Sequence, residues 1–285
     1  MPDPMIDTHI HLLEPDRFTY EWTNDFPALS GRFDLSDYEN ASRSSGIQAG
    51  VFMEVDCAES AEEGRYFCSL AEKPGALIQA VVAAARPESP GFEKSLEAMA
   101  HPRLTGIRRV LHTQPDELSQ AALFRENVNR LGGLGLTFDL CVLQRQLPLA
   151  LDLVRACPQT TFILDHCGVP AIADNNAPTG ADFLAWKKSI LAIAAEPHVN
   201  GKISGITTYS PTPLRNAQGL QPYIDTMLEA FRPDRLVWGG DWPVVNLGDG
   251  LEAWSTITLE LLSRLTESER TQILTDNAKR IYRIP

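Results

Sequence analysis

The sequence predicts an α/β protein with a (β/α)8 fold, a TIM barrel formed as a single domain by residues 1–285. Eight strand-like runs alternate with helix-like runs, which is the number that such a barrel needs. The chain length also suits one large barrel. An open doubly wound sheet is the alternative. It usually carries a glycine-rich phosphate loop after its first strand, and neither GxGxxG nor GxxxxGKS/T occurs.

The predicted strands are short runs rich in apolar residues. Several are continuously apolar, as expected for parallel strands that are buried on both faces. In chain order they are residues 5–10, 48–55, 77–85, 104–111, 136–143, 161–168, 198–205 and 235–242.

Helix-like segments fill most of the intervals between these strands. Their apolar residues recur with helical spacing, and serine, aspartate, proline or glycine marks many of their ends. The segments are 58–75, 119–133, 147–158, 181–197, 250–264 and 267–280. Two long loops, 14–31 and 169–180, each follow a strand, so we expect them to cover the catalytic mouth of the barrel.

The net charge and the cysteines argue against some classes of protein, such as nucleic-acid binders and disulfide-rich secreted proteins. The formal net charge of −12 argues against a nucleic-acid binder, which needs a basic surface. No apolar run approaches the ~18 residues of a membrane span, and the first residues lack the basic and apolar regions of a signal peptide, so we expect no secretory signal. The five cysteines are odd in number and form no CxxC motif, which favours reduced thiols and a cytoplasmic location.

Polar side chains gather where the predicted strands end, and in a TIM barrel that edge carries the chemistry. His9 and His11 stand two residues apart at the first strand, so both point to one face. His166 and Asp241 lie at the ends of the sixth and eighth strands. Polar groups at the ends of buried strands are costly unless they are paired or used. These four residues are therefore the candidate site, although a lone buried histidine is more often a satisfied core residue.

Six short stretches resemble the amidohydrolase superfamily. They are IDTHIHL, TGIRRVL, FDLCV, FILDHCGVP, GKISG and VWGGDWPV. The resemblance is to the amidohydrolase-2 branch in particular, the sugar-acid lactonases of the L-rhamnono- and L-fucono-lactonase type, with pyrone-dicarboxylate and sulfomuconolactone hydrolases as relatives. It implies one amidohydrolase-type barrel that opens a small-molecule lactone and acts as a monomer or a small homo-oligomer.

The departures from that superfamily bear on the metal. Its two-metal members use a lysine on strand 4 and histidines on strands 5 and 6, whereas strand 4 here reads GIRRVL and strand 5 reads FDLCVL. His9, His11, His166 and Asp241 remain as ligands, with Glu54 as a further candidate. This set suits one zinc or manganese ion, or no metal at all. Members of the lactonase branch work without a required metal, so we expect chelation to leave much of the activity.

Lactone hydrolysis gives each candidate a role. We predict Asp241 as the general base, which takes a proton from the attacking water and later gives one to the leaving ring oxygen. His9, His11 and His166, or a metal that they hold, would polarise the carbonyl group.

Other residues are candidates for binding the substrate. Side chains alternate along a strand, so only one of Arg108 and Arg109 can face the lumen, and the match to GIR favours Arg108. Arg109 would then form a salt bridge toward a helix. The aromatic rings of Trp22, Tyr20 and Trp242 could stack on a sugar ring or could pack under a loop.

Four further polar residues are candidates for binding the substrate or for structural roles. Glu54 and Lys202 are candidates for contacting the substrate, but Lys202 could equally be a solvated loop charge. We interpret Asp7 and Asp165 as structural residues that orient nearby groups by hydrogen bonds.

Two other functions compete with the lactonase. A metal-dependent non-oxidative decarboxylase on the same scaffold would also use HxH, a later histidine and an aspartate after strand 8. A catalytically silent barrel that binds a sugar acid is the second alternative. Retention of all four polar residues argues against a silent barrel.

Overall fold

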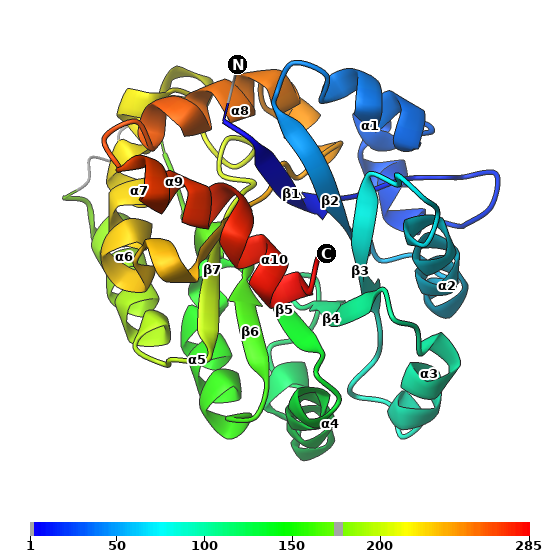
Figure 1. Ribbon diagram of the computed structural model, residues 1–285. Helices are drawn as coiled ribbons and strands as arrows, with labels where there is room; N and C mark the ends of the chain where they lie inside the picture. Colours follow the sequence, from blue (N-terminus) through cyan, green and yellow to red (C-terminus); the bar gives the residue numbers. More distant parts are fainter. Residues whose placement is uncertain (1–2, 174–178) are drawn as a thin grey trace.

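The computed structural model describes residues 3–173 and 179–285, so residues 174–178 of the predicted loop 169–180 lie outside the described part. Eight parallel strands form one sheet in the order β1 to β8, and the predicted α/β barrel is confirmed (Figure 1). The strands are β1 (Met5–Ile10), β2 (Ile47–Met53), β3 (Ile78–Ala84), β4 (Leu104–Val110), β5 (Thr137–Cys141), β6 (Thr161–Leu164), β7 (Val199–Ile203) and β8 (Leu236–Trp238).

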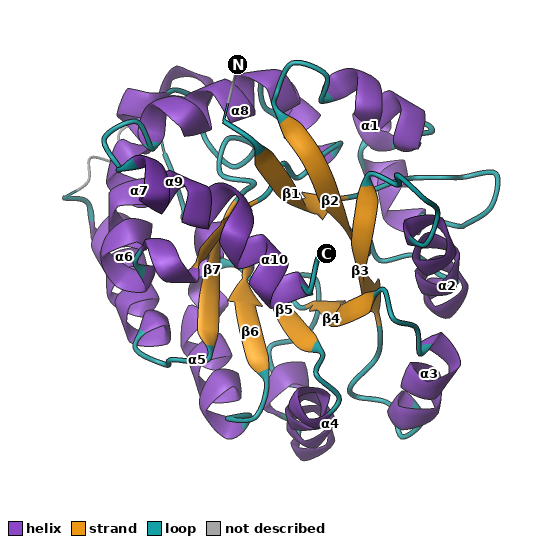
Figure 2. Cartoon of the chain, viewed as in Figure 1, coloured by secondary structure: helices purple, strands orange, loops and turns teal. Residues whose placement is uncertain are grey.

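Helices surround the strands (Figure 2). They are α1 (Leu35–Ala41), α2 (Ser60–Ala71), α3 (Phe92–Met99), α4 (Ala122–Gly133), α5 (Leu147–Ala156), α6 (Ala181–Ala194), α7 (Ala217–Phe231), α8 (Gly250–Leu261), α9 (Glu267–Thr271) and α10 (Asn277–Tyr282). Helices α1, α3 and α7 were not among the predicted segments. The first two are short, and α7 contains Pro222, a residue that usually ends or kinks a helix.

Two predicted strands, 161–168 and 235–242, end four residues earlier than their apolar pattern indicated. Strand β6 stops at Leu164, because the four residues from His166 to Val169 all have positive φ and form a left-handed turn. Strand β8 stops at Trp238, and Asp241 also has positive φ, at 59°. A left-handed backbone cannot continue a strand. The chain therefore leaves both strands at the edge where His166 and Asp241 lie.

The seam between the first and last strands is joined by Asp7. Its Oδ1 accepts hydrogen bonds from the backbone N–H of His9 at 2.9 Å and of Gly240 at 2.7 Å. Its Oδ2 accepts one from the Tyr38 hydroxyl at 2.7 Å. A Cβ on Gly240 would lie 2.3 Å from this oxygen, so the close approach requires glycine. Across the same seam Asp241 N–H donates to the His9 carbonyl at 2.8 Å, which brings these two residues together.

The C-terminal segment covers the opposite end of the barrel, where helix α10 crosses the strands (Figure 1). Asn277 Nδ2 donates to the carbonyls of Pro233 and Leu236 at the start of β8, at 2.7 and 2.8 Å. Arg283 Nη2 donates to the Leu104 carbonyl at the start of β4, at 3.0 Å. These bonds satisfy carbonyl groups at the amino ends of the strands.

Aromatic side chains fill the layer between the strands and the helices. Phe67 of α2 stacks on Phe52 of β2 with ring centroids 3.7 Å apart, and Phe124 of α4 packs edge-on against Phe138 of β5 at 6.2 Å. Each such buried ring contributes about 1.5–3 kcal/mol to stability. All five cysteines are buried and free. Within residues 3–173 and 179–285, no helix is both long and apolar enough to cross a bilayer.

Candidate active site

Three histidines and one aspartate meet at the carboxyl ends of the strands. His9 lies on β1, His11 directly follows it, His166 follows β6, and Asp241 follows β8. Asp241 Oδ1 lies 3.7 Å from His9 Nε2 and 3.5 Å from His11 Nε2, and its Oδ2 lies 4.0 Å from His166 Nδ1. All four residues are buried. The structure thus brings together the four residues that the sequence singled out.

Two of these residues occupy backbone conformations that side chains usually avoid. The φ angle is 54° at His166 and 59° at Asp241. Such a conformation costs about 1–3 kcal/mol per residue and persists only when surrounding contacts hold it. His166 N–H is held by the Ser204 hydroxyl at 3.2 Å, and the Ser204 hydroxyl also contacts His166 Nδ1 at 2.9 Å. The strain is therefore concentrated at the mouth.

His11 has a defined proton position. Its Nδ1 lies 2.9 Å from the Met53 carbonyl, which can only accept, so Nδ1 carries the proton. Its Nε2 then presents a lone pair toward the Asp241 carboxylate. A nitrogen lone pair and a carboxylate oxygen that face each other can share a proton, a water or a cation.

Arg108 forms the wall beside His9. Its Nε lies 2.6 Å from Glu54 Oε1, its Nη1 lies 3.2 Å from His9 Nε2, and its Nη2 donates to the Glu54 carbonyl. Burial would lower the pKa of Arg108, but the Glu54 carboxylate raises it, so the guanidinium is always charged. Arg109 points the other way and pairs with Glu88 at 2.9 Å. The alternation along β4 therefore turns only Arg108 toward the candidate site.

Lys202 lies beneath the histidines, in the lumen of the barrel. Its Nζ is 2.7 Å from Asp139 Oδ1, 2.8 Å from Asp165 Oδ1 and 3.2 Å from His9 Nδ1. The residue is 0% exposed, which corrects the expectation of a solvated loop charge. The two carboxylates compensate the ammonium, and Tyr282 adds a hydroxyl hydrogen bond of 2.7 Å to Asp139. A lysine with three buried polar neighbours is a structural cation.

The charges around the histidines set their protonation. Burial and the Lys202 ammonium hold the pKa of His9 well below its usual value. Burial likewise lowers the pKa of His166. For Asp165, burial alone would raise the pKa, but Lys202 and His9 hold it well below the usual range. His9 and His166 are therefore neutral at physiological pH, whereas Asp165 is ionised.

The aromatic candidates divide between the mouth and the core. Trp22 is partly buried and its Nε1–H donates to the Val55 carbonyl at 2.7 Å. Tyr20 is 6% exposed. The Trp242 ring is covered edge-on by Phe33 and Tyr38, at 5.6 and 5.4 Å. For Tyr20 and Trp242 this arrangement favours packing over stacking on a sugar.

The sequence did not single out every polar residue near the cluster. His112 Nδ1 lies 3.2 Å from Cys141 Sγ, and the Tyr209 ring lies 6.3 Å from the His166 ring. Asp139 was visible as a carboxylate in an apolar strand, but its lysine partner lies on another strand. Contacts of this kind depend on the closed barrel.

The donor set suits a divalent metal in type. One ring nitrogen each from His9 and His11 and one oxygen from Asp241 lie within 4.8 Å of one another, and so do donors from His9, Asp165 and His166. Imidazole and carboxylate ligands suit zinc or manganese. The bond from His11 Nδ1 to a carbonyl is the usual second contact of a metal-binding histidine. His11 and Asp241 are the residues that would hold an ion, and His9 offers a further donor nitrogen within the same distance.

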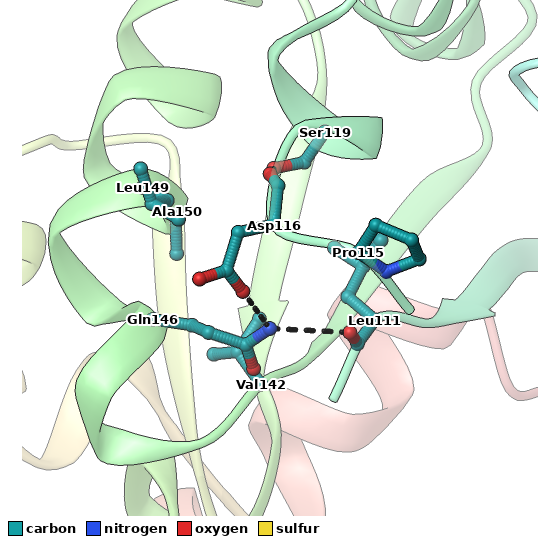
Figure 3. Close-up of a pocket in the computed structure, with 8 residues that line it drawn as sticks. All are labelled: Leu111, Pro115, Asp116, Ser119, Val142, Gln146, Leu149 and Ala150. Carbon is teal, nitrogen blue, oxygen red and sulfur yellow. Dashed lines mark hydrogen bonds between the residues drawn. The ribbon is translucent and has the colours of Figure 1, made fainter. Parts of the chain in front are cut away.

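A separate pocket lies between the segment after β4 and helix α5 (Figure 3). Gln146 Nε2 donates across it to the Leu111 carbonyl at 3.3 Å and to Asp116 Oδ1 at 2.8 Å. It is lined by Leu111, Pro115, Asp116, Ser119, Val142, Gln146, Leu149 and Ala150. None of these residues belongs to the cluster around Asp241, so we place the chemistry at the cluster.

Comparison with known proteins identifies the family. Residues 6–284 match the Amidohydrolase family. The chain belongs to this family. The resemblance predicted from the six short stretches is therefore confirmed, and the match includes every strand except the first residue of β1.

Several proteins similar to this chain are named as enzymes that hydrolyse lactones. L-fucono-1,5-lactonase of Burkholderia ambifaria is 28% identical over 98% of this chain and 95% of that protein. The 2-pyrone-4,6-dicarboxylate hydrolase of Comamonas testosteroni is 23% identical over 99% of this chain and 91% of that protein. A crystal structure of an amidohydrolase from Burkholderia multivorans with bound zinc has a TM-score of 0.87 at 25% identity, over 99% of this chain and 100% of that chain.

Proposed function

We propose that this amidohydrolase opens a sugar-acid lactone by attack of water, with Asp241 as the general base. One observation carries the proposal. Asp241 Oδ2 is buried and has no hydrogen-bond partner among the described residues, although it lies beside His166 and its Oδ1 lies beside His9 and His11. A buried carboxylate oxygen is normally paired. An unpaired one in a cluster of histidines is available to take a proton from water.

The histidines act on the carbonyl group of the lactone. As the water attacks, negative charge develops on the carbonyl oxygen, and a ring N–H of His9 or His166 aimed at that oxygen stabilises it. One such donor in a site without bulk water contributes about 3–4 kcal/mol. Asp241, now protonated, then gives its proton to the ring oxygen as the ring opens. A divalent ion, if bound by His11 and Asp241, would polarise the same carbonyl as a Lewis acid.

The substrate class follows from the relatives and from the charges at the mouth. The named relatives hydrolyse an aldonolactone, a pyrone dicarboxylate and a sulfomuconolactone. Arg108 can hold hydroxyl or carboxylate groups of such a ring, and Trp22 at the mouth can contact its carbon face. We propose that residues 1–285 act as one domain, since all eight strands contribute to one barrel.

A panel of lactones tests the proposal. The purified protein is mixed with aldono-1,4- and aldono-1,5-lactones and a pH indicator, with and without a chelator, and with Asp241→Asn as the matched inactive variant. We expect acid release from at least one aldonolactone, largely kept after chelation. Release of carbon dioxide from carboxylated aromatics, without acid release from lactones, would instead support the decarboxylase. Calorimetric binding of sugar acids without turnover of any lactone would support the silent barrel.

A further inference from the structure

His9 has a cation at each of its two ring nitrogens. Arg108 Nη1 lies 3.2 Å from Nε2, and Lys202 Nζ lies 3.2 Å from Nδ1. Carboxylate oxygens lie farther from the same two nitrogens, with Asp165 Oδ1 3.5 Å from Nδ1 and Asp241 Oδ1 3.7 Å from Nε2. The ring of His11, two residues later, contacts oxygens instead: a backbone carbonyl faces its Nδ1 and the Asp241 carboxylate faces its Nε2. The two histidines of one motif therefore differ in what they can bind.

A neutral imidazole has one N–H and one nitrogen lone pair, and only the lone pair can bind a metal. If His9 Nδ1 accepts from Lys202, then Nε2 carries the proton and has no lone pair to offer. If the lone pair is on Nε2, the N–H of Arg108 already points at it. In the first tautomer Nε2 has no lone pair for a metal ion, and in the second Arg108 competes for that lone pair. A histidine that serves a metal normally donates its second N–H to a carbonyl or carboxylate, as His11 does.

Both cations are fixed in place. Arg108 is 3% exposed and is bonded to Glu54 at 2.6 Å. Lys202 is fully buried between Asp139 and Asp165. Moving either cation away from His9 would leave a buried carboxylate without its partner, which is strongly unfavourable.

We propose that Arg108 and Lys202 exclude a divalent metal from His9, so that Arg108 and a metal ion compete for the lone pair of His9 Nε2. An ion at this mouth is then held through His11 and Asp241 and binds weakly. The guanidinium stands beside His9 as the fixed positive charge that a metal would otherwise supply. This inference concerns metal binding only, so it can fail or hold whichever substrate the site turns over.

Zinc titration of the intact protein tests the competition. Isothermal calorimetry measures the Zn²⁺ dissociation constant of wild type, Arg108→Met, Arg108→Lys and the control Arg109→Met. We expect Arg108→Met to bind zinc at least about tenfold more tightly than wild type, and Arg109→Met to bind as wild type does. Arg109→Met is the matched control, because it removes an arginine from the adjacent position of β4, where the side chain faces Glu88. An unchanged constant in Arg108→Met would overturn the proposal.

Removal of a nearby positive charge could tighten zinc binding without any competition, and two variants separate these causes. In Arg108→Met combined with His9→Ala, the gain should vanish if it acts through His9, and should persist if it is a charge effect only. Arg108→Lys keeps the charge but loses the planar fork, so competition predicts a partial gain. Persistence of the full gain in the double variant would overturn the proposal.

A measurement on the wild-type protein tests the proposal without requiring any variant to fold. Histidine side-chain ¹⁵N NMR reports which ring nitrogen is protonated and which one binds an ion. Zinc added to wild type should shift the ring nitrogens of His11 and leave those of His9 unchanged. A zinc-induced shift of His9 Nε2, with tight binding that His9→Ala loosens by tenfold or more, would show that His9 is a ligand and would overturn the proposal.

Discussion

The two ends of the barrel treat their polar groups in opposite ways. At the mouth, Asp241 Oδ2 is buried without a hydrogen bond among the described residues, and the backbone at His166 is left-handed. At the floor, Asn277 and Tyr282 donate to carbonyls or to a buried carboxylate with good geometry. Unpaired groups and strain reduce stability, and they persist where function needs them. The mouth is thus the working end and the floor is the stabilising end.

The largest expected effect lies at the mouth, in Asp241→Asn. The amide has nearly the same shape but cannot take a proton from water, so we expect kcat for lactone hydrolysis to fall by about 10²–10⁴. The melting temperature should not fall, because the change removes a buried charge with an unpaired oxygen. The control is Asp249→Asn, an exposed aspartate in the next loop. A fall in kcat of less than about tenfold would show that Asp241 is not the base.

At the floor, Asn277→Ala should lower stability and leave activity unchanged, the reverse of what we expect for Asp241→Asn. It leaves the carbonyls of Pro233 and Leu236 without their donor, which should lower the free energy of unfolding by about 1–3 kcal/mol. Activity per folded molecule should be unchanged. Thermal unfolding and kcat are measured beside Lys279→Ala, an exposed residue of the same helix. If kcat fell as much as stability, the separation of the two ends would not hold.

Glu63→Gln tests whether unpaired groups near the mouth reduce stability. Glu63 on α2 is fully buried, neither oxygen has a partner among the described residues, and burial and then Glu54 raise its pKa well above the usual value. The folded state therefore holds a proton that the unfolded state releases above about pH 4.5, so wild-type stability falls as pH rises through this range. The glutamine variant should melt a few degrees higher at pH 7.

The pH dependence of the melting temperature tests whether Glu63 is protonated in the folded state. The gain in melting temperature of Glu63→Gln over wild type should shrink as pH falls below about 4.5, where the unfolded state of wild type also becomes protonated. Glu62→Gln changes the exposed neighbour and should show no such trend. A gain that did not vary with pH would mean that packing, rather than the proton, explains it.

The smallest expected effect is that of Arg109→Ala. Arg109 pairs with Glu88 on the side of β4 away from the histidines, so kcat/KM should change by less than about threefold. Arg108→Ala should reduce kcat/KM far more, because its guanidinium lies beside His9. Circular dichroism verifies that both variants are folded. Equal large losses in the two variants would contradict the assignment of faces along β4.

The parts that could be predicted from the sequence are those set by local pattern. Apolar runs at barrel spacing identified all eight strands, and polar residues at their ends identified His9, His11, His166 and Asp241. Alternation along one strand predicted that only one of Arg108 and Arg109 faces the lumen, and the match to GIR favoured Arg108, which is the one beside His9. Each inference used residues that are close in sequence together with the rule that strand ends meet at one edge.

The parts that could not be predicted depend on distant partners. In the sequence, Lys202 is the single charged residue of the stretch GKISG. Only the closed barrel places Asp139 and Asp165 around it. The left-handed turn that begins at His166 depends on Ser204 from the loop after β7. The short helices α1 and α3 are held by packing rather than by a long periodic pattern, and so they were missed.

The hydroxyl contact of Tyr282 on Asp139 affects the order in which the chain matures. Asp139 and Lys202 belong to strands β5 and β7 and leave the ribosome before Tyr282 does. A nascent chain can therefore assemble its eight strands while its buried charges still lack one hydrogen bond and the floor lacks its cover. We therefore expect the floor to close late in biogenesis. Ribosome-bound chains arrested before residue 277 emerges should accordingly be cleaved faster by protease than chains extended past residue 285.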